Sequence, residues 1–295
     1  MSVMLTIFTP TYNRAYCLHQ VYESLLRQTS KDFLWLVVDD GSTDGTDQLV
    51  EKWKGYKNGF EIIYVHQENG GMHTAHNTAY RTITTELNVC IDSDDYMIED
   101  AVESIISLWK EKKAEQYSGI VALDISTSGN IIGTPLPKRK SIRLCDYYYQ
   151  GGKGDKKLIY RTDVMKRYPE YPVFEGEKFV PLGYKYLLVD QDYRLLILNK
   201  PVCVVEYLPD GSTRNRFRQY ANNPKGFAFE RKIYMLYGVG VLTRYKKCIH
   251  YVSNSLMSKD LHFIGSSPKK LMTVLAIPFG IVLYYFTIFK AGTGK

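Results

Sequence analysis

The segment Asp92-Ser93-Asp94-Asp95 places three carboxylates directly after a short apolar run, residues 87–91, that reads as a strand. Carboxylates crowded at a strand end repel one another and lose hydration, which costs free energy. A divalent cation removes this cost, and dense oxygen ligands suit Mg²⁺ or Mn²⁺, with phosphate oxygens completing the shell. The segment therefore predicts a metal-diphosphate site. The alternative is an acidic loop or helix N-terminus, where aspartate is common.

The first half of the chain alternates between strand-like and helix-like segments, which must position this acidic segment. The expected strands are 3–8, 33–38, 61–66 and 87–91, and the expected helices are 15–28, 46–53, 73–82 and 99–112. Such alternation predicts an α/β fold, with a mostly parallel sheet flanked by helices on both faces. Ligands of such sheets lie at the carboxyl ends of the strands, near a reversal in strand order.

A polar cluster follows each of these four strands. The clusters are residues 9–14 (TPTYNR), 39–42 (DDGS), 69–71 (NGG) and 92–95 (DSDD). Because parallel strands end at one edge of a sheet, we expect all four clusters to converge on one ligand. Tyr12 offers a flat ring for stacking, and Gly70-Gly71 permits close backbone approach. Asp39 and Asp40 can accept hydrogen bonds from a base N–H or a ribose hydroxyl. Alternatively, they can form an Asx-turn and cap a helix.

Composition bounds the class of protein. The chain has 295 residues with 45% hydrophobic and 23% charged residues, enough to bury a core in one large or two modest domains. Its five cysteines include no CxxC pair, which argues against a disulfide framework or a zinc site and is typical of a reducing cytosol.

The C-terminal part differs in charge and hydropathy. Residues 211–270 carry a net charge of +10, against +7 for the whole chain, so the remainder carries −3. The nineteen residues 271–289 have no charge, but Pro278 and Gly280 interrupt them. They could span a bilayer, lie in one leaflet or form a buried core helix. Basic residues beside an apolar helix favour an anionic membrane surface over nucleic acid, for which no fold motif is present.

The ordered polar clusters strongly resemble those of family 2 glycosyltransferases with the GT-A (Rossmann-like) fold. The resemblance is carried by residues 9–14, 38–44, 69–77 and 91–95, and covers roughly the first hundred residues. Two later segments, 174–179 and 206–212, look like those of bacterial capsule and cell-surface polysaccharide members. The expected organisation is therefore a GT-A glycosyltransferase domain over 1–210 and a helical membrane-associating region over 211–295.

The resemblance implies roles for the clustered residues. Tyr12 would stack on the base and Asp40 would accept from it. The DXD element would be Asp92-Ser93-Asp94, with Asp92 facing ribose or the donor sugar and Asp94 ligating Mn²⁺ or Mg²⁺; Asp95 is an alternative ligand. The implied nucleotide-binding residues are Pro10, Thr11, Tyr12, Asp40, Asn69, Gly70, Gly71, Asp92 and Ser93.

A catalytic base is expected in the later acidic segment. Inversion at the anomeric carbon needs a base that deprotonates the acceptor hydroxyl. Glu177 is the first choice and Glu175 the second, although the family's usual Glu-Asp pair is here Glu-Gly-Glu-Lys. Weaker candidates for the base are Asp190 and Asp192. A flexible lid over the diphosphate is expected at Ser212, Thr213 and Arg214. Met72 stands where related sequences often carry a basic residue.

These patterns predict an inverting, metal-dependent glycosyltransferase. It would move a sugar from a nucleotide-sugar donor, expected to be UDP-linked, to a lipid-linked saccharide acceptor in envelope or capsular polysaccharide synthesis. It would work at the cytoplasmic face of the cell membrane as a peripheral or monotopic protein. Two alternatives are a nucleotidyltransferase on a similar sheet and a non-catalytic nucleotide-binding membrane scaffold.

Overall fold

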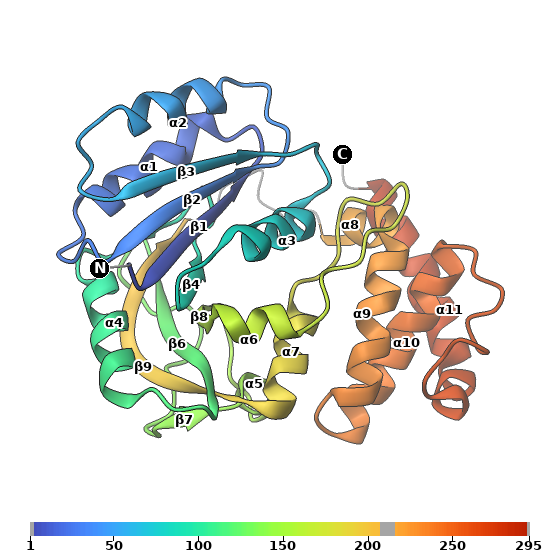
Figure 1. Cartoon of the computed structure of the whole chain (residues 1–295). Coiled ribbons are helices and arrows are strands. Elements are labelled where there is room, and N and C mark those ends of the chain that lie inside the picture. Colours follow the sequence, from blue (N-terminus) through green and yellow to red (C-terminus); the bar gives the residue numbers. More distant parts are fainter. Residues whose placement is uncertain (1–2, 207–215, 294–295) are drawn as a thin grey trace. The chain divides into compact units, whose positions relative to one another are not determined.

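The computed structural model of the chain describes residues 3–206 and 216–293 (Figure 1). The chain divides into two compact units. The first comprises Met1–Glu170 and Asp192–Leu208, and the second comprises Tyr171–Gln191 and Pro209–Lys295. The segment 171–191 thus groups with the C-terminal unit, whereas the sequence places the domain boundary at residue 210. The expected lid residues 212–214 lie outside the described residues.

One nine-stranded sheet forms the centre of the described part of the first unit. Its strands are β1 (Leu5–Thr11), β2 (Phe33–Asp39), β3 (Glu61–His66), β4 (Leu87–Cys90), β5 (Tyr96–Met97), β6 (Tyr117–Ser126), β7 (Ser141–Ile142), β8 (Lys156–Arg161) and β9 (Arg194–Val205). Their order is β3-β2-β1-β4-β8-β6-β9-β5, with β7 beside β9. Strands β1 to β4 run parallel, whereas β8 is antiparallel to both β4 and β6. The predicted α/β class is confirmed, with a later half of the sheet that is mixed.

Strand β1 lies at a reversal of strand order. After β1 the chain moves outward through β2 to β3, and it then returns to place β4 on the other side of β1. Parallel neighbours require crossover connections, and helices supply them: α1 (Ala15–Leu26), α2 (Thr46–Lys54) and α3 (Met72–Thr82). The carboxyl ends of β1 and β4 are therefore neighbours, which is where ligands of doubly wound sheets bind.

Helices cover both faces of this half of the sheet (Figure 1). On one face, Leu5 and Ile7 of β1 pack in a core cluster with residues of α1, α2 and α4 (Ala101–Lys112). On the other face, the Phe8 ring meets His76 and Tyr80 of α3 at centroid distances of 5.0 and 5.8 Å. Burial on both faces explains why β2 reads as an almost continuous apolar run, and β1 is likewise buried along its whole length, its threonines included. The shorter helices of this unit are α5 (Leu144–Tyr149) and α6 (Thr162–Arg167).

Helices dominate the second unit. They are α7 (Gly183–Asp192), which extends one residue beyond it, α8 (Arg216–Asn222), α9 (Pro224–Tyr237), α10 (Val241–Met257) and α11 (Lys270–Thr293). A small core of Met235, Cys248, Tyr251, Val252 and Ala276 joins α9, α10 and α11.

Helix α11 has two different faces. Small residues line the face toward α10: Thr273 and Ala276 are fully buried, and a Cβ on Gly280 would lie 2.5 Å from Val252. The opposite face is apolar and open, with Phe279 58% and Val282 69% exposed. By length and composition α11 is suited to cross a membrane, and 22% of its most apolar window is buried. The buried core-helix interpretation of 271–289 is therefore wrong for this structure.

A cluster of charged and titratable groups lies between α9 and α10. The buried Glu230 carboxylate pairs with Arg231 and, at 3.3 Å, with Lys247. Burial lowers the pKa of Lys247 to about 8 against the raising effect of Glu230. Burial, helped by Arg231 and Lys247, also lowers the pKa of His250 to about 4. His250 is therefore neutral in the folded protein at neutral pH.

The lowered pKa of His250 predicts acid sensitivity of the second unit. The unfolded chain takes up a proton near pH 6.5 and the folded chain only near pH 4, so stability falls as the pH drops from about 7 to 4. We expect a loss of about 2 kcal/mol over this window, after allowing for partial solvent screening.

The measurement is urea unfolding, followed by hydrogen exchange of the α10 amides, at pH 7 and pH 5. His250→Asn should remove most of the difference between the two pH values. An equal pH effect in wild type and variant would show that another group is responsible.

Candidate active site at the carboxyl edge of the sheet

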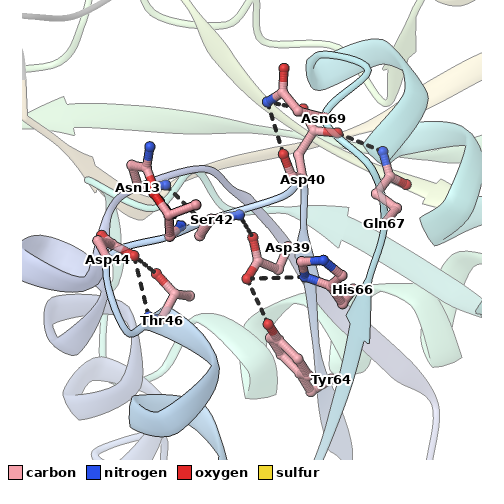
Figure 2. A network of polar contacts seen from close by, with 11 residues as sticks. Asn13, Asp39, Asp40, Ser42, Asp44, Thr46, Tyr64, His66, Gln67 and Asn69 are labelled. Carbon is pink, nitrogen blue, oxygen red and sulfur yellow. Dashed lines mark hydrogen bonds and ion pairs between the residues drawn. The ribbon is translucent and has the colours of Figure 1, made fainter.

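The loop after β1 is tied to the loop after β2. Asn13 adopts a positive φ of 52°, its backbone N–H donates to Ser42 Oγ at 2.8 Å, and its Oδ1 accepts from the Thr43 N–H at 2.8 Å (Figure 2). These bonds fix the backbone directly after Tyr12, a residue that is 48% exposed. The loop therefore presents an aromatic face to solvent from a rigid base, as the predicted stacking role requires.

Asp39 is used to build the turn after β2. Its Oδ1 accepts from the Ser42 N–H at 2.8 Å, and its Oδ2 accepts from the Tyr64 hydroxyl at 2.6 Å (Figure 2). The Oδ2 also lies 3.7 Å from His66 Nδ1. Asp39 is fully buried, so the Asx-turn alternative describes this residue.

Asp40 anchors the loop after β3. Its two carboxylate oxygens accept from the backbone N–H groups of Gly70 at 2.9 Å and Gly71 at 2.7 Å. The side chains of Gln67 and Asn69 donate to the same carboxylate at 2.7 and 3.2 Å (Figure 2). Gly41 allows this arrangement, because a Cβ at that position would lie 2.9 Å from the Asn69 nitrogen. Asp40 thus joins the DDGS and NGG clusters directly, and a base that used it would share an already bonded carboxylate.

Two buried polar groups beside these loops lack protein partners within the described residues. Neither ring nitrogen of His73 nor the hydroxyl of Thr11 forms a hydrogen bond there. Burial lowers the pKa of His73, against the raising effect of Asp40, so the ring is neutral. Buried polar groups without partners are costly, and a bound ligand is one way to satisfy them. His76 instead packs between Phe8 and Tyr80, as a structural histidine does.

The acidic tetrad alternates in exposure. Asp92 and Asp94 are half-buried, whereas Ser93 and Asp95 are buried. Two carboxylates therefore lie on the more accessible side of the segment.

Asp95 faces inward and pairs with a buried lysine. Its Oδ2 lies 3.4 Å from Lys157 Nζ on β8, and the same ammonium lies 3.8 Å from Asp124 on β6. Burial raises the pKa of Asp95 to about 7 against the lowering effect of Lys157. Burial alone would lower the pKa of Lys157, but the surrounding acidic groups, Asp124 foremost, raise it well above its usual range. The sequence interpretation missed Lys157, and Asp95 could ligate a metal only by leaving it.

The remaining tetrad residues suit a hard divalent cation. In the part of the chain that the structure describes, no three His, Cys, Asp or Glu side chains are grouped to hold a metal. If Asp92 and Asp94 hold Mg²⁺ or Mn²⁺, oxygens of a bound diphosphate must complete the ligand set. Sites with one or two protein carboxylates and substrate phosphates are usual for Mg²⁺.

The two expected base residues lie in the second unit and differ in environment. Both oxygens of Glu177 accept from the first turn of α9, from the Lys225 N–H and the Gly226 N–H, each at 2.8 Å. The Lys178 N–H in turn donates to Asn223 at 2.9 Å. Glu177 is 9% exposed and neutralises a helix N-terminus, whereas Glu175 is exposed to solvent. The weaker candidate Asp192 accepts from the Tyr168 hydroxyl at 2.6 Å, and Asp190 is buried.

The first unit is an α/β domain with carboxylates at one edge of its sheet, and comparison with known proteins gives its family. Residues 6–168 match the family model described as Glycosyl transferase family 2. This match covers more than half of the chain, so the protein belongs to family 2 of the glycosyltransferases and is a glycosyltransferase. The family assignment favours sugar transfer over the nucleotidyltransferase alternative.

Two sequence relatives each match less than half of the chain. The chain is 30% identical to glycosyltransferase GlyA of Streptococcus pneumoniae over 119 residues, which is 40% of this chain and 16% of GlyA. It is 30% identical to the chondroitin synthase of Escherichia coli over 129 residues, which is 44% of this chain and 18% of that enzyme. The matched segments are thus a small part of these longer relatives.

Solved structures share the fold over nearly the whole chain. S. aureus TarS 1–349 in complex with UDP-GlcNAc has a TM-score of 0.62 at 18% identity, covering 99% of this chain and 92% of that one. The mannosyltransferase PcManGT from Pyrobaculum calidifontis, in complex with GDP-Man and Mn²⁺, has a TM-score of 0.56 at 16% identity, covering 99% and 75%. At this identity the likeness establishes the GT-A fold and nothing finer.

The contrast between the two glutamates predicts different responses to removal of charge. In Glu177→Gln, an amide N–H replaces one acceptor and faces a backbone N–H at the start of α9. We expect a loss of about 2 kcal/mol in unfolding free energy, measured by urea denaturation. Glu175→Gln is the matched control and should cost under about 0.5 kcal/mol. Equal stability of Glu177→Gln and wild type would contradict the capping role.

Proposed function

We propose that this glycosyltransferase is inverting and metal-dependent, and that it transfers a sugar from a UDP-linked donor to a hydroxyl of a lipid-linked saccharide in envelope polysaccharide synthesis. One observation carries the proposal. The loops after β1, β2 and β3 are joined by hydrogen bonds at the edge where Asp92 and Asp94 follow β4. The residues that we expect to bind the nucleoside and a pair of carboxylates therefore share one edge of the sheet.

The donor class is supported by charge and by likeness of fold. A diphosphate brings negative charge to an edge that already carries carboxylates, so a divalent cation must accompany it. TarS binds UDP-GlcNAc and PcManGT binds GDP-Man with Mn²⁺ on the same fold. We assign UDP to this chain because Tyr12 and Asp40 reproduce the family's nucleoside contacts by resemblance.

The chain's own residues would divide the reaction between them. The Tyr12 ring and the 69–71 loop would hold the nucleoside, and Asp92 and Asp94 would hold the cation. When bound, that cation supplies Lewis-acid stabilisation of the departing diphosphate. A carboxylate would accept the proton of the acceptor hydroxyl as its oxygen attacks. Between the two candidates, Glu175 suits this role better, because Glu177 is already committed to α9.

Asp94→Asn tests the metal assignment. Asp94 is half-buried on the accessible side of the tetrad, so the amide should keep the fold but weaken the cation site. Thermal unfolding is measured with a panel of nucleotide sugars, with and without Mn²⁺. Wild type should gain several degrees with its donor only when Mn²⁺ is present, since ligands that bind only the folded state stabilise it. The variant should lose that gain, and donor hydrolysis should fall at least about a hundredfold.

Glu111→Gln on α4 is the matched control, because it removes an exposed carboxylate outside the tetrad. It should respond to Mn²⁺ and donor as wild type does. Unchanged donor binding and hydrolysis in Asp94→Asn would defeat the metal assignment. A wild type that binds the donor but never releases sugar would support the scaffold alternative.

The second unit is proposed to place the enzyme on the cytoplasmic face of the membrane. The exposed face of α11 carries Phe279 and Val282, and lysines at 269, 270 and 290 flank its uncharged stretch, residues 271–289. Apolar side chains between lysines are typical of a helix that enters an anionic bilayer surface.

The packing of α11 favours one leaflet over a span. The Tyr245 hydroxyl of α10 donates to the Leu275 carbonyl at 3.0 Å, and Val252 contacts Gly280. Helix α10 therefore runs beside the middle of α11 and brings Lys246 and Lys247 with it. Lysines at the centre of a bilayer cost several kcal/mol each, so α11 would lie in the interface with α10 on its aqueous side.

Substitution of the exposed face tests this placement. The double variant Phe279→Glu/Val282→Glu should lose at least about tenfold in partitioning to vesicles containing anionic phosphatidylglycerol, because two apolar anchors are replaced by repelled charges. Vesicle co-sedimentation measures this. Val173→Glu is the control, since Val173 is equally exposed at 67% but lies outside α11.

Topology is read from cysteines placed at Lys269 and Lys290 in a cysteine-free background. Both should react with a membrane-impermeant thiol reagent from the same side of sealed vesicles. Labelling from opposite sides would overturn the one-leaflet placement.

A further inference from the structure

Lys157 is a buried lysine in the middle of the sheet, directly behind the acidic tetrad. It lies on β8, between β4 and β6, and only 8% of it is exposed. Its Nζ lies 3.4 Å from Asp95 and 3.8 Å from Asp124, and both of these carboxylates are buried. A buried charge persists only when it is paired, so the three side chains form one ionic unit.

This ionic unit is not neutral. One ammonium faces two carboxylates, which leaves an excess of one negative charge inside the sheet when all three are ionised. Asp94 precedes Asp95 directly in the chain, so this excess adds to the negative charge that a cation meets at the accessible side of the tetrad.

Asp95 also links the tetrad to the end of β9. Its Oδ1 accepts from the Glu206 N–H at 3.4 Å, and its Oδ2 meets the Cys203 thiol at 3.9 Å. A rotation of Asp95 away from Lys157 would release these contacts and let the backbone of Asp94 move. The direction of Asp95 therefore decides which carboxylates the tetrad presents to solvent.

We propose that Lys157 is a positioning residue for the metal-diphosphate site: it holds Asp95 inward, leaves Asp92 and Asp94 as the accessible pair, and offsets part of the negative charge that a diphosphate meets. This inference rests on the proposed function, because it assumes that a cation and a diphosphate bind at the tetrad. Lys157, inside the sheet, would then help to set the affinity of the site for both the cation and the diphosphate.

Lys157→Met should change the two affinities in opposite directions. Loss of the ammonium removes the partner that holds Asp95 inward. Once Asp95 turns outward into solvent, its carboxylate ionises and makes the tetrad more negative. Mn²⁺ alone should then bind at least about threefold tighter, and UDP at saturating Mn²⁺ at least about threefold weaker. Free Mn²⁺ is measured by electron paramagnetic resonance and UDP binding by calorimetry. Lys157→Arg keeps the charge and should return both affinities toward wild type.

Lys156→Met is a closely matched control. Lys156 is the preceding residue and is also buried, but among the described residues its Nζ donates to backbone carbonyls alone, including those of Ile132 at 2.8 Å and Asp155 at 3.0 Å. Loss of that lysine can lower stability, but it should leave both affinities within about twofold of wild type. A merely structural defect near β8 would instead weaken both ligands in both variants.

Asp124→Asn keeps the inference testable if Lys157→Met does not fold. It removes the competing carboxylate and gives Lys157 wholly to Asp95, so Mn²⁺ should bind at least about threefold weaker. Folded Lys157→Met with unchanged or weaker Mn²⁺ binding would overturn this inference alone, as would unchanged Mn²⁺ binding in Asp124→Asn. Wild type that binds no Mn²⁺, with or without UDP, would overturn the metal-dependent function and the inference together.

Discussion

The crowding of negative charge at the carboxyl edge of β1 to β4 is the constraint on which the site depends. Each carboxylate there must find donors or a counter-ion, because an unpaired buried charge is too costly to keep. Asp39 accepts hydrogen bonds from the Ser42 N–H and the Tyr64 hydroxyl. Asp40 accepts hydrogen bonds from the N–H groups of Gly70 and Gly71. Asp95 takes Lys157. Asp39, Asp40 and Asp95 therefore have structural roles at this edge. These roles distinguish them from Asp92 and Asp94, which are half-buried.

The parallel half of the sheet and its convergent loops were predictable from the sequence because they follow from local signals. Buried parallel strands read as apolar runs, and polar residues that follow each run must meet at one edge. The motif order then identified the family, which the match over residues 6–168 confirms. The later strands differ from this pattern, since β8 pairs antiparallel with its neighbours on both sides.

The partners of individual carboxylates were not predictable, because they come from distant parts of the chain. Lys157 is 62 residues from Asp95, and the α9 amides are 48 and 49 residues from Glu177. A Lys-Lys pair at the start of a strand looks like a solvated edge, and nothing local shows that both ammonium groups are buried. The role of Glu177 was not predictable for the same reason. In sequence, an acidic loop residue that caps a distant helix looks the same as a candidate base.

The distribution of charge carries more information than the net value of +7. In the first unit Lys157 is outnumbered by Asp95 and Asp124, so the edge of the sheet favours a cation. In the second unit the buried Glu230 is outnumbered by Arg231 and Lys247, and the lysines on either side of the uncharged stretch 271–289 add further positive charge. Under the proposed function, a cation-accompanied diphosphate and an anionic surface would be the complementary ligands of these two environments. Each unit therefore has a polarity suited to one step of the proposed task, which is to bring a charged, soluble donor to an acceptor held at a membrane.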